Sequence, residues 1–193
     1  MTWPPIIRVF FAIDFTPEVQ DALHQVILSM KKSARKGHIL WTRAENLHVT
    51  LKFLPTLNIE NLPKLEMQVS SMLKKYRAPL PLHVGSCITF PFDFRPRIIA
   101  MEVIPMQLLQ PIADEMTTIC NELQLPQRDN NEFRPHITLG RVKHPKNVSL
   151  HDFLIDKLPT VPPINVDHIT LFRSQPASAG AHHYTIIKRF PLG

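Results

Sequence analysis

The sequence predicts an α+β fold of two pseudo-symmetric lobes, each an antiparallel sheet packed by helices, with a central cleft between them. Short β-branched and aromatic runs alternate with amphipathic helical segments along the chain. A strand–helix–strand order occurs twice, and it places His48-Val49-Thr50 and His136-Ile137-Thr138 at positions 88 residues apart. The composition, with 44% hydrophobic and 20% charged residues, is typical of a globular protein.

The first half of the chain opens with a predicted buried strand over residues 6–13. A helix follows, with Thr16 as its N-cap and Pro17 at its first position, and it runs to a basic cluster at residues 31–36 before Gly37. Two extended segments, an amphipathic helix and a strand come next, over residues 38–42, 47–54, 58–76 and 80–90.

The second half repeats this order. The predicted elements are a strand, a helix, an extended segment, a weaker helix and two closing strands, over residues 97–103, 106–124, 135–142, 148–157, 162–173 and 184–190. The prolines lie at the edges of elements and not in one linker. We therefore expect a single domain over residues 1–193, built by internal duplication from two lobe-forming halves at about 6–90 and 97–190.

Composition excludes several classes of protein. No apolar run approaches the ~20 residues of a membrane-spanning helix, and the first residues lack the basic start of a signal peptide. Cys87 and Cys120 lie far apart, which excludes a disulfide scaffold and a cysteine-based zinc site. We expect a monomeric, cytoplasmic protein with no metal or cofactor. Its net charge of +6 suits a polyanionic partner.

The two His-x-Thr triplets are the candidate catalytic residues. Residues two apart in a strand point to the same face, so each histidine projects together with its threonine. Two imidazoles can act as a general base and a general acid, and two hydroxyls can donate hydrogen bonds to phosphate oxygens. Cleavage of a phosphodiester without a metal ion needs this set of groups.

A third triplet, His168-Ile169-Thr170, has no counterpart in the duplicated pattern. Chance alone gives about 0.6 such triplets at this composition, so one accidental copy is unsurprising. We expect His168 to have a structural role and no part in catalysis.

The segments around the first two triplets resemble a known family. Residues 46–54 (NLHVTLKFL) and 133–141 (FRPHITLGR) are similar to the two signature segments of the RNA 2′,3′-cyclic phosphodiesterases. These enzymes were formerly called 2′-5′ RNA ligases and belong to the two-histidine phosphoesterase superfamily. The resemblance covers nearly the whole chain, including the opening strand at residues 8–13 and the closing pattern from Leu171 to Tyr184.

The resemblance implies an enzyme that opens a terminal 2′,3′-cyclic phosphate, on RNA or on a small cyclic nucleotide, and leaves a 2′-phosphomonoester. It implies that His48 is the proton donor and His136 the proton acceptor, an assignment that the symmetry of the sequence leaves open. Thr50 and Thr138 would hold the phosphate, and Arg141 resembles an arginine on the phosphate side of the family's site.

Two details complicate this resemblance. Pro55 stands where the family usually has glycine, so the loop that follows is expected to differ. Strict alternation along a strand points Arg141 away from His136, although a bulge at Gly140 would redirect it.

Two other functions remain open. One is a nucleotide- or RNA-binding module without catalysis, which the two intact His-x-Thr motifs disfavour. The other is weak 2′-5′ RNA ligation, which could use the same residues by microscopic reversibility.

Several other groups are weaker candidates. Three basic clusters, at residues 31–36, 74–77 and 141–146, could contact RNA phosphates, and the last adjoins the second motif. Phe53 or Phe11 could stack on a terminal base, although core packing is the favoured role for both. His182 and His183 point to opposite faces of their strand and so make a poor metal chelate.

Overall fold

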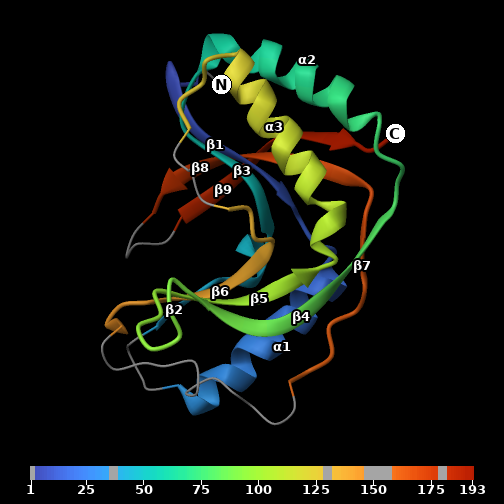
Figure 1. Ribbon diagram of the computed structural model, residues 1–193. Coiled ribbons are helices and arrows are strands. Elements are labelled where there is room, and N and C mark those ends of the chain that lie inside the picture. Colours follow the sequence, from blue (N-terminus) through green and yellow to red (C-terminus); the bar gives the residue numbers. More distant parts are fainter. Residues whose placement is uncertain (1–2, 35–38, 128–131, 146–157, 178–181) are drawn as a thin grey trace.

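The computed structural model describes residues 3–34, 39–127, 132–145, 158–177 and 182–193, and Figure 1 shows their arrangement. Within these ranges, nine antiparallel strands form one sheet in the order β7-β4-β5-β6-β3-β1-β8-β9, and β2 pairs with β6. The strands are β1 Ile6–Ile13, β2 Ile39–Trp41, β3 Val49–Asn58, β4 Leu80–Phe90, β5 Ile98–Ile104, β6 His136–Val142, β7 Ile164–Val166, β8 His168–Pro176 and β9 His182–Pro191.

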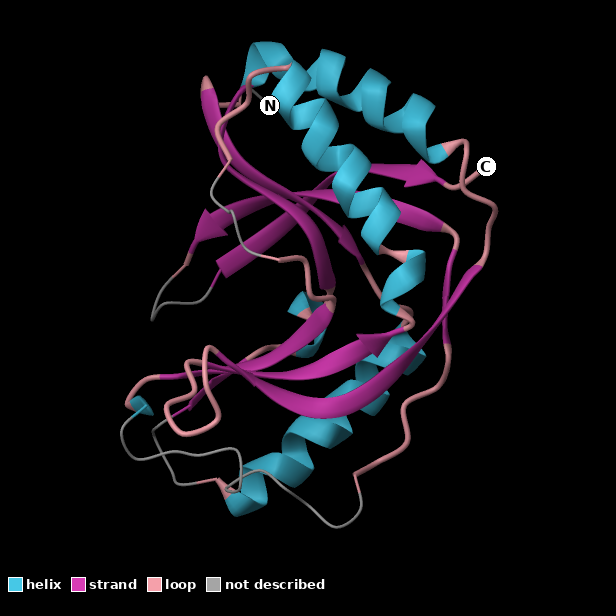
Figure 2. Cartoon of the chain, viewed as in Figure 1, coloured by secondary structure: helices cyan, strands magenta, loops and turns pink. Residues whose placement is uncertain are grey.

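Figure 2 shows that the strands splay into two arms, with helices on their outer sides. Helices α2 and α3 cover the arm that contains β1, β3, β8 and β9, whereas α1 lies on the outer side of β4, β5 and β6. The helices are α1 Pro17–Ser33, α2 Leu62–Leu73 and α3 Gln110–Glu122, with short 3₁₀ turns η1 Ala44–Asn46, η2 Ile59–Asn61 and η3 Met106–Leu108.

The two arms meet where β3 and β6 pair, and the two His-x-Thr motifs lie at this pairing. The paired residues are Val49 and Ile137, which are 88 residues apart, as the two His-x-Thr triplets are. Strand β4, from the first half of the chain, pairs with β5, and β8, from the second half, pairs with β1. Each arm therefore draws strands from both halves, which differs from the expectation that each half forms one lobe.

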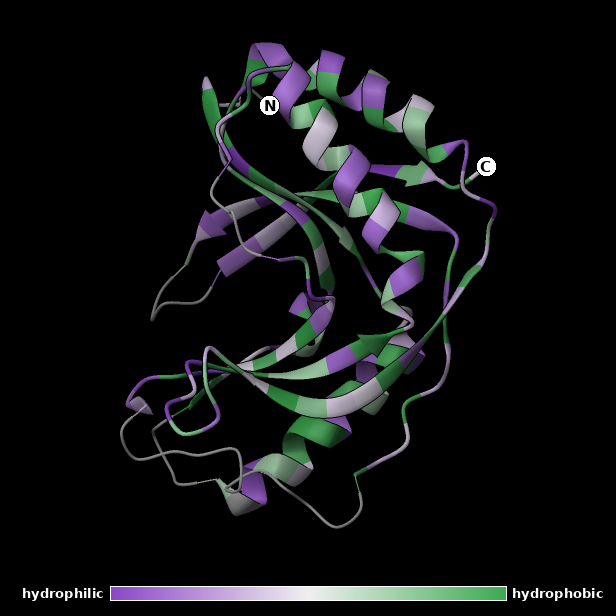
Figure 3. Ribbon diagram, viewed as in Figure 1, coloured by the Kyte–Doolittle hydropathy of each residue, from purple (hydrophilic) through white to green (hydrophobic). Residues whose placement is uncertain are grey.

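The helices form where capping and apolar spacing predict them. The Thr16 hydroxyl accepts a hydrogen bond from the Val19 amide at 3.5 Å, which confirms it as the N-cap of α1. Figure 3 shows hydrophobic and hydrophilic residues alternating along α2 and α3, as expected for helices with one face on a sheet. The second and third helices begin later than predicted, because a 3₁₀ turn precedes each. The buried residues of α2 are Leu65, Val69, Met72 and Leu73.

Two predicted segments differ in the structure. Strand β3 continues through Pro55 to Asn58, because an irregularity in its pairing with β1 accommodates a residue that cannot donate to the ladder. The single strand predicted at residues 162–173 is two strands, β7 and β8, separated at Asp167 and paired with different arms. The helix predicted at residues 148–157 lies outside the described residues.

No helix in the described part of the chain combines the length and the apolar character needed to cross a membrane.

Candidate active site

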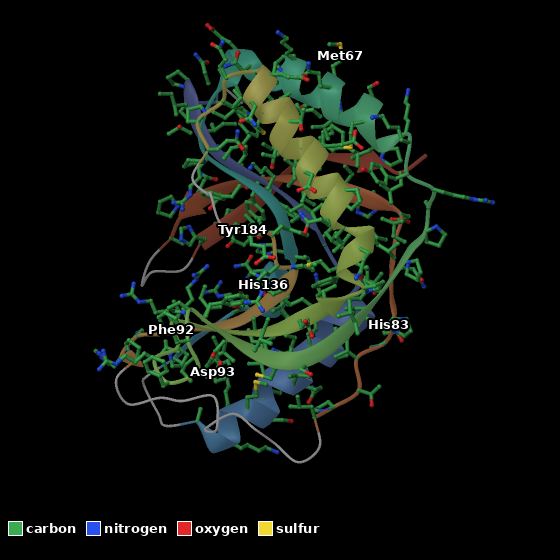
Figure 4. All side chains as sticks on the ribbon, viewed as in Figure 1. Met67, His83, Phe92, Asp93, His136 and Tyr184 are labelled. Atoms are coloured by element: carbon green, nitrogen blue, oxygen red, sulfur yellow. The ribbon has the colours of Figure 1, made fainter. Side chains whose placement is uncertain are left out.

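A cleft with a cavity volume of about 200 Å³ lies at the junction of the two arms. Figure 4 shows His136 near this junction and Tyr184 on the facing arm. All five residues that the sequence analysis assigned line the cleft: His48, Thr50, His136, Thr138 and Arg141. The topology explains this convergence, because the two motif strands β3 and β6 are neighbours in the sheet.

The His48 ring is held in one orientation by its backbone and its neighbours. Its Nδ1 lies 2.7 Å from the Asn46 carbonyl oxygen, and because a carbonyl only accepts, Nδ1 carries the proton. In the neutral ring, Nε2 therefore accepts the hydrogen bond from the Thr50 hydroxyl, 3.0 Å away. Phe10 packs on the ring with centroids 4.9 Å apart, and Tyr184 contacts it edge-on at 5.4 Å.

A backbone carbonyl and a phenylalanine hold the His136 ring in the same way. Its Nδ1 lies 2.7 Å from the carbonyl oxygen of Arg134, the residue two positions earlier, as for His48. Phe90 packs on the ring, with centroids 4.7 Å apart. Each histidine is therefore fixed in the tautomer that leaves Nε2 as its basic nitrogen, a state suited to taking up or giving a proton in the cleft.

A duplicated bulge directs two further side chains into the cleft. In the pairing of β5 with β6, Ile99 pairs with Gly140 and Ala100 with Thr138, so β6 holds an extra residue. The pairing of β1 with β3 shifts in the same way between Phe11 and Ala12. The predicted bulge is therefore present, and Arg141 lines the cleft on the same side as His136 and Thr138.

Phe53 is the counterpart of Arg141 in the first motif, 88 residues earlier. It lines the cleft and carries the Arg8 guanidinium over its ring at 4.8 Å. Phe11, in contrast, is fully buried. The prediction that both residues pack in the core is therefore confirmed for Phe11 and wrong for Phe53.

Both catalytic candidates have lowered pKa values. Burial is the main cause that lowers the pKa of His48 from the ordinary 6.5 to about 4. Positive charge on His136 and Arg141 lowers this pKa further, whereas the hydrogen bond to Asn46 raises it. Burial, together with Arg141 and Arg134, also lowers the pKa of His136, against its own backbone hydrogen bond. Both rings are therefore mainly neutral at pH 7.

Several residues that line the cleft were missed in the sequence analysis. Arg8 is one of them, and its Nε is buried with no hydrogen-bond partner among the described residues. The others are Phe10, Thr42, Asn46, Ile98, Ser174, His182 and Tyr184. Alternation along β1 offered a signal for two of them, because Arg8 and Phe10 lie on one face of that strand.

The last strand contributes to the cleft through one of its two adjacent histidines. His182 lines the cleft, and its carbonyl oxygen accepts a hydrogen bond from Asn46 Nδ2 at 3.0 Å. His183 is exposed. Among the described residues, no group of three or more His, Cys, Asp or Glu side chains could hold a metal ion.

The third triplet lies in a different place. His168 lines a separate cavity near the start of α1, where its Nε2 lies 3.0 Å from a carboxylate oxygen of Asp14. The Thr170 hydroxyl donates to the same oxygen at 2.7 Å, and Arg189 donates to the other at 3.0 Å. The triplet thus supplies two of the partners of a half-buried carboxylate.

Two of the basic clusters differ in their surroundings. In the cluster at residues 74–77, Lys75 pairs with Glu115 at 2.6 Å and Tyr76 donates to the same carboxylate at 2.7 Å, which joins α2 to α3. In the cluster at residues 141–146, Arg141 lines the cleft and Lys143 is exposed.

Comparisons with known proteins identify sequence relatives that cover between 71% and 96% of the chain. An RNA 2′,3′-cyclic phosphodiesterase of Methanothermobacter thermautotrophicus is 27% identical over 189 residues, which cover 96% of this chain and 99% of the relative. One of Thermotoga maritima is 28% identical over 138 residues, 71% of each chain. The Escherichia coli protein LigT, complexed with 3′-AMP, has a TM-score of 0.74 and 25% identity, with 97% of this chain and 98% of LigT covered.

A protein of Thermus thermophilus has a TM-score of 0.74 and 25% identity, with 96% of this chain and 98% of that protein covered. The α+β architecture predicted from the sequence matches that of these solved relatives. The sequence profile of the 2′-5′ RNA ligase superfamily matches residues 14–177, which include both His-x-Thr motifs and Arg141. The chain belongs to the 2′-5′ RNA ligase superfamily.

Proposed function

We propose that the cleft hydrolyses the terminal 2′,3′-cyclic phosphate of RNA to a 2′-phosphomonoester by paired-histidine acid–base catalysis. One observation supports this most strongly: two imidazoles, each with Nδ1 bonded to a backbone carbonyl, line one cleft with two threonines and an arginine. Relatives named RNA 2′,3′-cyclic phosphodiesterase support the same substrate class.

In the proposed reaction, Nε2 of His136 takes a proton from water as the water oxygen attacks phosphorus. The bond from phosphorus to the 3′ oxygen breaks, and Nε2 of His48 gives its proton to that oxygen, which leaves the phosphate on the 2′ oxygen. One O–P bond forms and one breaks. His136 begins neutral and ends charged, whereas His48 begins charged and ends neutral.

The lowered pKa of His48 constrains its role as donor. A proton donor must be charged when the substrate is bound, yet burial by the protein alone favours the neutral ring. An anionic phosphate close to Nε2 raises the pKa of the ring, because opposite charge favours the imidazolium. In this proposal, the substrate itself brings His48 into its active protonation state.

The remaining cleft residues bind the substrate. Thr50 and Thr138 donate hydrogen bonds to the non-bridging oxygens, and the Arg141 guanidinium balances the charge that develops on them. Arg8 offers its buried, unpaired Nε to a phosphate or ribose oxygen. Phe53 lies under the Arg8 guanidinium and presents an aromatic surface to the terminal base.

The experiment is an end-group assay on a short RNA that carries a 2′,3′-cyclic phosphate. The wild-type protein should convert the cyclic end to a monoester that resists a phosphatase specific for 3′-phosphates, and should do so in excess EDTA. Joining of RNA ends in place of hydrolysis would identify a ligase. Binding of the RNA without any change of its end would identify a module without catalysis.

A further inference from the structure

Two phenylalanines outside the cleft project into solvent from the loop between β4 and β5. Phe92 and Phe94 are 58% and 69% exposed, and within the described residues they are the two exposed side chains of Phe, Trp or Tyr. Their rings stack on each other, with centroids 5.4 Å apart and planes at 11°. Their exposure forms an apolar surface of the kind that marks binding sites on proteins.

The loop holds this pair in place through its own hydrogen bonds. The Thr89 hydroxyl donates to the Asp93 carboxylate at 2.5 Å, and the Arg95 amide donates to the Phe92 carbonyl at 3.3 Å. The Arg97 amide donates to the Phe90 carbonyl at 2.6 Å and closes the hairpin. The two rings are therefore presented by an ordered turn, so a ligand would find them already arranged.

Both ends of the loop adjoin the cleft. Phe90 packs on the His136 ring at 4.7 Å, and Ile98, which pairs with Phe90 across the hairpin, lines the cleft. Figure 4 shows Phe92 at the free end of the β4–β5 arm, away from His136. Phe92 follows Phe90 by two residues, so their Cα atoms are at most about 7 Å apart, and the pair lies next to the wall of the cleft that holds His136.

The charge around the loop is positive. Arg95, Arg97 and Arg134 are exposed, and the Arg134 guanidinium lies over the Phe90 ring at 5.7 Å. The Asp93 carboxylate, which accepts a hydrogen bond from Thr89, is the one acidic side chain between Pro91 and Arg97, so the sum of these charges is still positive. Aromatic rings interleaved with arginines favour single-stranded nucleic acid, whose bases stack on the rings while its phosphates pair with the guanidinium groups.

We infer that Phe92 and Phe94 form a stacking platform for the unpaired bases that precede the cyclic end of the RNA. The substrate of this protein is then a single-stranded RNA end, which it binds more tightly than a mononucleotide with the same cyclic phosphate. This inference rests on the proposed function, because the proposed function places the cyclic phosphate end of the RNA in the cleft.

The test compares two substrates in the Phe92→Ala/Phe94→Ala double variant. For an eight-nucleotide RNA with a 2′,3′-cyclic phosphate, KM should rise by about 10-fold or more, since stacking on one aromatic ring is worth a factor of this order. For 2′,3′-cyclic AMP, which does not reach the loop, kcat and KM should stay at their wild-type values. A Phe92→Trp/Phe94→Trp variant should restore the wild-type KM for the octamer.

Met67→Ala is the matched control. Met67 is 65% exposed on α2, and Figure 4 shows it at the opposite end of the molecule from the loop. Its loss should change neither substrate's kinetics. Thermal unfolding of each variant should show the wild-type transition, because the replaced side chains are mostly exposed.

A binding measurement separates this inference from the proposed function. Fluorescence anisotropy with the same octamer ending in a 3′ hydroxyl needs no turnover, and the double variant should bind it about 10-fold more weakly than the wild type. Equal effects on the octamer and cyclic AMP, or no effect on either substrate or on binding, would overturn the platform. Loss of self-association with unchanged RNA binding would also overturn it, by showing an interface between copies.

Discussion

His48 and His136 present the same chemistry from two copies of one local structure. Each Nδ1 donates to the carbonyl two residues earlier, and each ring packs against a phenylalanine, Phe10 or Phe90. The backbone thus sets the tautomer of both rings, which a carboxylate partner does in many other histidine sites. Because no acidic side chain among the described residues holds these imidazoles, their charge depends on burial, on these backbone hydrogen bonds and on the positive groups nearby.

His48→Gln and His136→Gln should each lower the turnover of a cyclic-phosphate RNA end by about 10²–10⁴-fold, the usual loss for a general acid or base. His168→Gln is the matched control, because His168 lines another cavity and bonds to Asp14. It should retain turnover within a few-fold of the wild type. The measurement is a kinetic comparison of the three folded variants, and a loss at His168 as deep as the others would overturn the choice of motifs.

The buried His48 should also make stability depend on pH. Its pKa is about 4 in the folded protein and 6.5 in the unfolded chain, so the unfolded chain binds the proton more readily. Its contribution to the free energy of unfolding is fully present above pH 6.5 and is lost as pH falls toward 4. The loss should reach about 3 kcal/mol at about 1.4 kcal/mol per pKa unit.

Urea unfolding of the wild type and His48→Gln between pH 4 and pH 7.5 measures this effect. From pH 7.5 to pH 4, the free energy of unfolding of the wild type should fall by about 3 kcal/mol more than that of His48→Gln. If the difference in free energy of unfolding between the wild type and His48→Gln did not change with pH, the His48 ring would not have a lowered pKa in the folded protein.

At the scale of elements, the bulge in β6 determines whether Arg141 enters the cleft. Gly140 lies at this bulge, against β2, and a Cβ there would meet Ile39 Cγ2 at 2.8 Å and Trp41 Cε3 at 3.1 Å. Gly140→Ala should therefore lower the free energy of unfolding by about 1–3 kcal/mol, as overpacking does in other cores. It should also lower kcat/KM, because the strand that holds Arg141 must shift.

Gly85→Ala in β4 is the control for Gly140→Ala. The closest atom to its Cβ would be Glu102 Oε2 at 3.0 Å, the end of a flexible side chain that can move away. Chemical denaturation should show a change of less than about 0.5 kcal/mol for this variant. If both glycine variants lost stability equally, the close approach of β2 to β6 would not explain why residue 140 must be small.

The elements also show what a single sequence predicts and what it does not. Periodicity and capping identified α1, α2 and α3, because apolar spacing and caps are local signals. The continuation of β3 through Pro55 was not predicted, since it depends on how β1 pairs with β3. The break at Asp167 was also missed, because β7 and β8 join different arms and only tertiary pairing separates them.

Across the whole molecule, the pairing of β3 with β6 brings the two motifs together. The equal spacing predicted that His48 and His136 would meet, and the pairing of Val49 with Ile137 between them explains how. The spacing did not predict which strands form each arm, because a repeat in the sequence does not specify which strands pair with each other. For the same reason Ser174, His182 and Tyr184, from strands outside the motifs, were not identified as cleft residues.

The sharpest test of the paired-histidine mechanism is the pH dependence of kcat/KM in the wild type and in the variants His48→Gln and His136→Gln. The wild type should show a bell-shaped profile with its optimum below pH 6.5, because burial lowers the pKa of both rings from that value. His136→Gln should lose the decline on the acidic side, since no base remains to be protonated, and His48→Gln should lose the decline on the alkaline side. A bell-shaped profile that survives unchanged in either variant would show that this mechanism is wrong.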